Sequence, residues 1–126
     1  MIETNIINQL PMVVHHRVKG PMSVNEAMAG VTNALSVVKR AVSLSERLHL
    51  ILDMRGYIFD SLDSHKIWKT QFTQNSLLSE HVECVAAIGD PGPKLIAEKE
   101  LMESGKLKFF TDFNLAFQWL RNQEVY

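Results

Sequence analysis

Hydrophobic and polar positions divide the chain into short apolar runs and longer stretches with helical spacing. Residues 12–19 form a short run rich in β-branched side chains that ends at a Gly-Pro pair, which predicts a strand. Apolar residues then recur at spacings of 3 and 4, which predicts a long amphipathic helix. This apolar stripe consists of Val24, Met28, Val31, Leu35, Val38 and Val42.

The start of this helix carries a signal of its own. Ser23 and Glu26 have the spacing of a capping box, in which the serine hydroxyl and the glutamate carboxylate accept hydrogen bonds from each other's backbone amides. Met22 and Ala27 occupy the hydrophobic positions that flank such a box. The sequence therefore predicts that the helix begins directly after Ser23.

A second strand and helix follow. Residues 48–54 are apolar on nearly both faces, as in a strand buried between two layers. Polar residues at 60–63 then interrupt the pattern, and any of their side chains is a suitable N-cap. From there we expect a second helix that runs through Trp68 toward Leu78.

Two further strand–helix pairs complete the chain. Residues 82–88 predict a third strand, and a helix over about 94–104 follows a turn rich in proline and glycine, with Gly105 as its stop. In this helix, lysines precede glutamates by four residues at 94/98 and 99/103, a spacing that favours ion pairs. Residues 107–110 predict a fourth strand, and Asp112 is the expected cap of the last helix. The apolar face of that helix consists of Phe113, Ala116, Phe117 and Leu120.

This alternation of strands and helices predicts an α/β fold with a mixed, mostly parallel sheet of 4–5 strands and about four helices. Residues 5–7 add an edge strand before the first unit. The length of 126 residues suits one domain, and no linker or repeat divides residues 1–126.

Composition and charge narrow the classes of partner. Apolar residues make up 46% of the chain and charged residues 21%, as in ordinary globular domains. Thirteen basic residues against 14 acidic residues argue against nucleic acid as a partner. No apolar run approaches the roughly 18 residues of a membrane helix, and no secretory signal is visible. Cys84 is the single cysteine and lies in an apolar stretch, so we expect a buried thiol and no intramolecular disulfide. From these features together we expect a cytoplasmic protein without integral membrane association.

Several segments together resemble the SpoIIAA-like fold family, which includes STAS domains and a STAS-like group of small bacterial proteins. The resemblance rests on the strand at 50–53 that ends in aspartate, on Trp68, on residues 85–90 and on the pattern at 109–120. It covers nearly the whole chain and contains no catalytic motif. It implies a mixed sheet with stacked helices, in a non-enzymatic regulatory or protein-interaction module.

The resemblance also implies a place for a partner. In antagonists of anti-sigma factors from this family, a strand that ends in aspartate leads to a loop with a phosphorylatable serine at a helix start. Ser61 comes closest to that position here, and Asp53, Arg55 and Asp60 share its loop region. The loop is one residue short, and Asp63 would repel a phosphate on Ser61 unless a cation such as Arg55 offsets it. Ser61 is therefore either a phosphoacceptor or a helix cap in a loop that faces a protein partner.

Other chemistry has weaker support in the sequence. Asp53, Asp60 and His65 are the strongest catalytic alternative, because two carboxylates and a histidine can divide acid and base roles in a hydrolase. Caps and turns explain the same residues without catalysis. No residues have zinc-site spacing, and the loop at 90–94 lacks the donors of a phosphate loop, so we expect no metal or cofactor.

Trp68 and Trp119 form the second candidate site. They wall either an apolar pocket or a homodimer face, with plain core packing as the alternative. A pocket between the helix layer and the sheet would hold a small apolar or lipid-like ligand, as some proteins of related fold do. Two functions thus stay open, an interaction module and a binding protein for a small apolar molecule.

Overall fold

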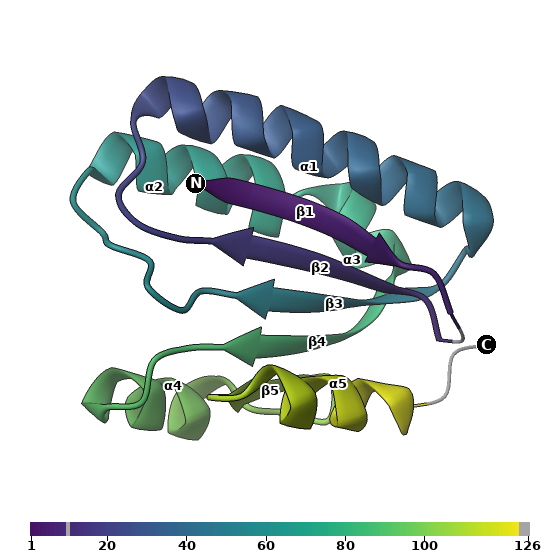
Figure 1. Cartoon of the computed structure of the whole chain (residues 1–126). Helices are drawn as coiled ribbons and strands as arrows, with labels where there is room; N and C mark the ends of the chain where they lie inside the picture. The colour runs from purple at the N-terminus through teal and green to yellow at the C-terminus, as the bar shows by residue number, and fades with distance from the viewer. Residues whose placement is uncertain (10, 124–126) are drawn as a thin grey trace.

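Five strands form one sheet in the computed structural model, which describes residues 1–9 and 11–123. The strands are β1 (Ile2–Ile7), β2 (Val13–Val18), β3 (Leu48–Asp53), β4 (Val82–Ile88) and β5 (Leu107–Phe110). They lie in the order β1-β2-β3-β4-β5 (Figure 1). β1 pairs antiparallel with β2, and all other neighbours are parallel. The predicted α/β class and the additional edge strand are confirmed.

Helices cover both faces of this sheet. They are α1 (Val24–Leu44), α2 (Leu62–Trp68), α3 (Ser76–His81), α4 (Pro93–Met102) and α5 (Phe113–Arg121), with a π-helical turn η1 (Lys69–Thr73) between α2 and α3. α1, α2–α3 and α4 connect successive parallel strands, so right-handed crossovers place them on one face. α5 follows the last strand and packs on the opposite face.

The N-terminus of α1 forms as the sequence predicts. The Ser23 hydroxyl accepts a hydrogen bond from the Glu26 amide at 3.1 Å, and the Glu26 carboxylate accepts one from the Ser23 amide at 3.3 Å. Both halves of the capping box are therefore present.

The face of α1 that packs on the sheet carries smaller side chains than the predicted apolar stripe does. Ala27, Ala34 and Ala41 are fully buried, whereas Val24 and Met28 at the start of the stripe are exposed. Because alanine side chains are small, they allow α1 to lie close to the sheet. The first turns of the predicted stripe, with Val24 and Met28, are not covered by the sheet or by α2.

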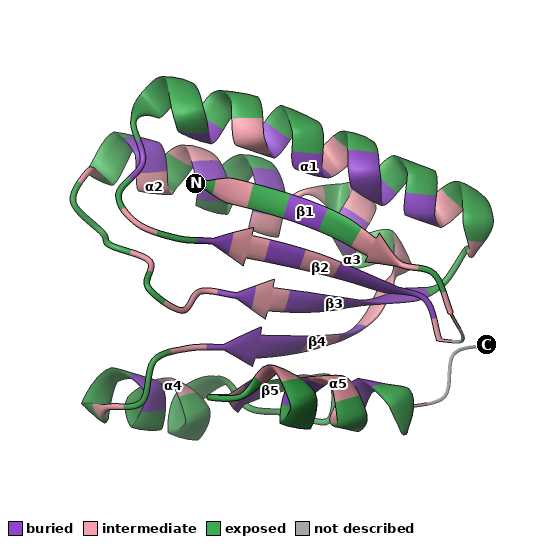
Figure 2. Cartoon of the chain, in the orientation of Figure 1, coloured by how far each residue is buried: buried purple, intermediate pink, exposed green. Residues whose placement is uncertain are grey.

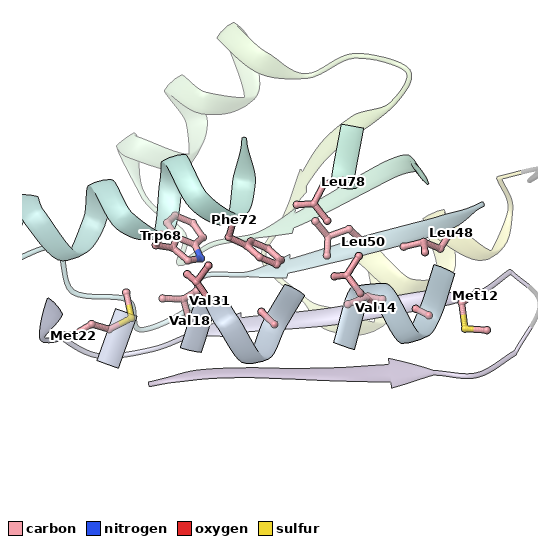
Figure 3. Close-up of a cluster of buried hydrophobic side chains, with 13 residues drawn as sticks. Met12, Val14, Val18, Met22, Val31, Leu48, Leu50, Trp68, Phe72 and Leu78 are labelled. Atoms are coloured by element: carbon pink, nitrogen blue, oxygen red, sulfur yellow. The ribbon is translucent and has the colours of Figure 1, made fainter. Parts of the chain in front are cut away.

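The two largest of three apolar clusters fill the space on the two faces of the sheet, and the third, small one packs α4 against β4 and β5. The largest lies between the sheet and α1 to α3 and includes Trp68, Phe72 and Leu50 (Figure 3). The second joins Ile51 and Ile88 to α5 on the other face. Buried residues accordingly follow β2, β3 and β4 along most of their length (Figure 2). Such burial on both faces agrees with the nearly continuous apolar character of residues 48–54.

The second helix differs from the prediction because it does not continue to Leu78. α2 ends at Trp68, and the π-turn that follows shifts the helical register so that Phe72 is buried against the ring of His16, with centroids 3.9 Å apart. A new helix, α3, begins after Asn75, whose side chain accepts a hydrogen bond from the Leu77 amide at 2.9 Å. The break between α2 and α3 thus allows Phe72 to pack in the core.

The end of α4 also differs from the prediction. The helix stops at Met102, and Glu103 is already extended, so Gly105 is not its stop. The Glu103 carboxylate accepts a hydrogen bond from the Phe109 amide at 2.9 Å, which draws the chain into β5. The expected lysine–glutamate pairs at 94/98 and 99/103 are not among the ion pairs of the described residues.

Candidate functional site

Asp53 lies at the carboxyl end of β3 and is fully buried. Its carboxylate accepts hydrogen bonds from Arg55 Nε at 3.0 Å and Arg55 Nη2 at 2.9 Å, and His15 Nε2 lies 3.2 Å from Oδ2. Burial alone would raise the pKa of Asp53, but these hydrogen bonds outweigh burial and hold the pKa below its ordinary value. Asp53 is therefore an ionised and fully paired group that ties β2 to β3 and to the chain beyond β3.

The Asp53 carboxylate faces α5 rather than α2. Side chains alternate along a strand, and Ile51, two residues earlier, packs in the cluster beneath α5. The paired His15 ring contacts Phe113 of α5, with centroids 5.0 Å apart. Asp53 and Arg55 are thus separated from Ser61, which begins a helix on the other face.

Ser61 is the residue that caps α2. Its hydroxyl accepts a hydrogen bond from the Ser64 amide at 3.3 Å. Ser61 is half-buried, whereas the neighbouring Asp60 and Asp63 are exposed. Of the polar residues at 60–63, Ser61 is the N-cap of the helix, so it lies at a helix start as the resemblance implies.

Three large apolar side chains are exposed around this cap. Ile58, Phe59 and Leu62 are 53%, 53% and 55% exposed, and with Ser61 they form what we call the 58–62 surface. The segment before it is held by backbone hydrogen bonds from the Gly20 amide to Gly56 at 2.7 Å and from the Ile58 amide to Gly20 at 3.2 Å. Sequence reasoning missed this surface, because apolar residues near a helix start are just as consistent with burial.

His65 belongs to an aromatic cluster beneath the 58–62 surface. Its Nδ1 lies 2.9 Å from the Tyr57 hydroxyl, and its ring centroid lies 4.4 Å from that of Phe59. Burial, followed by the charges of Lys69 and Lys94, lowers the pKa of His65. The alternative hydrolase group does not assemble, since the Asp53 carboxylate faces α5 and His65 lies on α2 across the sheet.

Trp68 is part of the core rather than of an interface. It is 4% exposed, and its indole Nε1 donates a hydrogen bond to His16 Nε2 at 2.9 Å. His16 Nδ1 lies 2.9 Å from Thr4 Oγ1. An indole can only donate, so Nε2 is the accepting nitrogen and Nδ1 carries the proton toward Thr4. Burial and the nearby His15 lower the pKa of His16 to about 3.

Trp119 lies on the opposite side of the molecule. It is half-buried on α5, where its ring centroid is 5.9 Å from that of Phe110 and 5.6 Å from Lys108 Nζ. Because Trp68 packs above one face of the sheet and Trp119 above the other, they do not share a pocket or an interface. The expectation that pairs them is not met.

Two cavities lie elsewhere. An apolar cavity of about 370 Å³ lies between α3, the end of α4 and the sheet, with Leu52, Val85, Leu78 and Met102 among its lining residues. A second cavity, of about 340 Å³, lies where β3 and β4 end, between the segment at 54–57 and the start of α4; we call it the mixed cavity, because polar and apolar groups both line it. Neither was predicted in this form, because each brings together side chains from three or more segments.

Metal binding, membrane spanning and thiol reactivity can each be examined in the part of the chain that the structure describes. Over residues 1–9 and 11–123, no three His, Cys, Asp or Glu side chains are grouped so that they could hold a metal ion. In the same part of the chain, no helix has the length and apolar character needed to cross a membrane. Cys84 is free and buried, and burial and Glu83 raise the pKa of its thiol, as expected for an inert cysteine.

The arrangement of strands and helices is similar to that of a known structure. The crystal structure of an uncharacterized protein of the DUF3478 family from Shewanella loihica PV-4, described as having a SpoIIAA-like fold, matches with a TM-score of 0.64. The match covers 94% of this chain and 93% of that chain at 19% sequence identity. The chain has a SpoIIAA-like fold. No protein-family model matches the sequence, and no curated protein matches it.

Proposed function

We propose that the protein is a non-enzymatic STAS-like interaction module that binds a partner protein through the 58–62 surface. One observation carries this proposal: Ile58, Phe59 and Leu62 are all more than half exposed beside the helix cap Ser61. Contiguous exposed apolar side chains mark interaction surfaces more than scattered ones do. The SpoIIAA-like fold supports the proposal, since the resemblance to STAS domains implies a partner-facing serine at this helix start.

The 58–62 surface is held in place before any partner arrives. The two backbone hydrogen bonds to Gly20 restrain the chain, and Phe59 packs on the ring of His65. A restrained surface loses less conformational entropy on binding, so more of its contact energy contributes to affinity.

Charge indicates the kind of partner that fits. Asp60 and Asp63 flank the apolar side chains, are exposed, and are not among the ion pairs of the described residues. A partner segment with apolar anchors and basic neighbours would complement both features.

A matched pair of variants tests the proposed surface. We expect Phe59→Asp to reduce capture of the partner from cells that naturally produce the protein by at least roughly tenfold, the loss typical of an interface anchor. Leu101→Asp is the control, because Leu101 is even more exposed but lies on α4, away from the 58–62 surface. If both variants capture every protein as the unmodified chain does, the 58–62 surface is not the binding site.

Ser61 provides a place for regulation of the same surface. Aspartate is as good an N-cap as serine, so Ser61→Asp should fold while adding a negative charge between Phe59 and Leu62. We expect this change to shift partner affinity by roughly fivefold or more, in line with the effect of a charge at an apolar interface. Ser76→Asp, at the exposed start of α3, is the control and should leave affinity unchanged. Equal effects of the two variants would contradict a regulatory role for Ser61.

A second candidate function is favoured by the apolar cavity. Its lining is mainly aliphatic, and it lies between the helix layer and the sheet, where a small apolar or lipid-like ligand was expected. Ser79→Leu should partly fill it from α3 and displace such a ligand. Native mass spectrometry of the purified protein should show an added mass that this variant lacks, and an unliganded mass together with no uptake of a fluorescent fatty acid would reject this candidate.

A further inference from the structure

The mixed cavity lies outside the carboxyl ends of β3 and β4, the end of a parallel sheet at which α/β proteins bind ligands. Met54 and Tyr57 line one side, and residues 89–95 with Glu98 line the other. It shares no lining residue with the apolar cavity. At about 340 Å³ it is at the small end of ligand pockets, so it suits a metabolite of a few atoms rather than a nucleotide.

One side of this cavity is held by several contacts. The Tyr57 amide donates to the Met54 carbonyl at 3.1 Å, its hydroxyl lies 2.9 Å from His65 Nδ1, and its ring packs on Trp68 with centroids 5.8 Å apart. Burial and the charge of Asp60 raise the pKa of Tyr57, so its phenol stays neutral. The cavity therefore has a fixed aromatic wall with a neutral hydroxyl.

The other side carries both signs of charge. Lys94 and Glu98 lie one turn apart on α4, yet they form no ion pair among those of the described residues. Burial and the charge of Lys69, followed by the charge of Lys94, lower the pKa of His65. Asp90 lines the cavity and connects its two sides, because its Oδ2 accepts a hydrogen bond from the Gly56 amide at 2.9 Å.

We propose that this cavity binds a small zwitterion of the amino-acid class. The ligand carboxylate pairs with Lys94, and its ammonium group pairs with Glu98 and Asp90. Its side chain lies against Met54 and Leu95, which are among the apolar residues of the lining. A ligand with one charge pairs with only one sign of these side chains, whereas a zwitterion makes charge-assisted hydrogen bonds with both.

Matched ligands test the requirement for two charges. Calorimetric titration of the full chain with the common L-amino acids identifies the tightest ligand, which is then compared with its deaminated acid and its decarboxylated amine. We expect both analogues to bind at least roughly tenfold more weakly, as for loss of one charge-assisted hydrogen bond. Equal binding of either analogue, or no binding of any amino acid at millimolar concentration, would overturn the proposal.

Matched variants test the location. Lys94→Gln and Glu98→Gln should each weaken binding of the tightest amino acid by roughly tenfold. Lys99→Gln and Glu100→Gln change exposed residues of the same helix outside the cavity and should leave affinity within about twofold. Circular dichroism checks that all four variants fold. If the two pairs of variants weaken binding equally, or neither does, the amino acid binds elsewhere and the assignment to this cavity is wrong.

Discussion

His15 and His16 show how two adjacent residues of one strand come to lie in different chemical environments. His15 faces α5, is partly exposed and pairs with Asp53. His16 faces the other side, is fully buried, and is held neutral between Thr4 and Trp68. Strand alternation predicts that they point apart, but only the structure shows that one completes an ion-pair cluster and the other a core hydrogen-bond network.

The burial of His16 predicts an acid-sensitive fold. Its pKa is about 3 in the folded chain and near 6.5 when unfolded, so between these values the unfolded chain binds more protons. Stability is therefore retained above pH 6.5 and falls as the pH drops toward 3, by up to about 1.4 kcal/mol per pH unit. Urea unfolding at a series of pH values measures this slope.

The matched variants separate His16 from other acid-sensitive groups. His16→Gln should be less stable at neutral pH but should show a shallower loss of stability between pH 6.5 and 4, within the same window. His81→Gln, at the end of α3, should keep the slope of the unmodified chain. Identical slopes for all three proteins would show that His16 does not control the acid response.

At the scale of elements, caps were predictable and helix lengths less so. Ser23 and Asp112 cap α1 and α5 as expected, since a cap depends on residues within one turn. The break between α2 and α3 was not predictable, because it depends on the packing of Phe72 against His16, which comes from a distant strand. The early end of α4 depends in the same way on the hydrogen bond from Phe109 to Glu103.

The contact between α1 and β1 predicts an unusual response to a helix-favouring substitution. A Cβ added at Gly30 would lie 2.7 Å from the Cβ of Ile2, closer than atoms pack. Alanine in a helix interior normally stabilises by up to about 1 kcal/mol relative to glycine. Here we expect Gly30→Ala to destabilise the fold by about 1–3 kcal/mol through overpacking, as measured by urea unfolding.

A double-mutant cycle identifies the cause. In an Ile2→Gly background every side-chain atom that the added Cβ would meet is absent, so Gly30→Ala should become neutral or stabilising relative to that background. Asn33→Ala, on the exposed side of α1, is the control and should change little. A destabilising Gly30→Ala in both backgrounds would show that the close approach to Ile2 is not responsible.

At the scale of the whole molecule, the sheet separates two environments. α1, α2, α3 and α4 cover one face and α5 the other, so the candidate residues of the sequence fall into unrelated places. Asp53 and Arg55 form a structural ion pair beneath α5, whereas Ser61 and the 58–62 surface lie at the start of α2. The mixed, mostly parallel sheet and the SpoIIAA-like fold were predictable, but the separation of Asp53 and Arg55 from Ser61 was not.

The two tryptophans report on this arrangement. Trp119→Phe leaves Trp68 as the single tryptophan, and because Trp68 is buried we expect its fluorescence to resist quenching by acrylamide. The unmodified chain should show an additional, more accessible component from the half-buried Trp119. Easy quenching of Trp68 in the folded variant would contradict its place in the core.

The sequence by itself determined what depends on neighbours within a few residues. Helical and strand periodicities define the order of elements, residues 82–88 match β4, and the cap at Ser23 follows from a spacing of three. Only the tertiary structure decided which side chains meet across long separations, such as His15 with Asp53 and Trp68 with His16, 38 and 52 positions apart. It also decided that Ile58, Phe59 and Leu62 stay exposed and that charged and apolar side chains line the same cavity near Tyr57 and Lys94. The physical reason is that burial and charge pairing depend on the elements that cover a residue, and these come from distant parts of the chain.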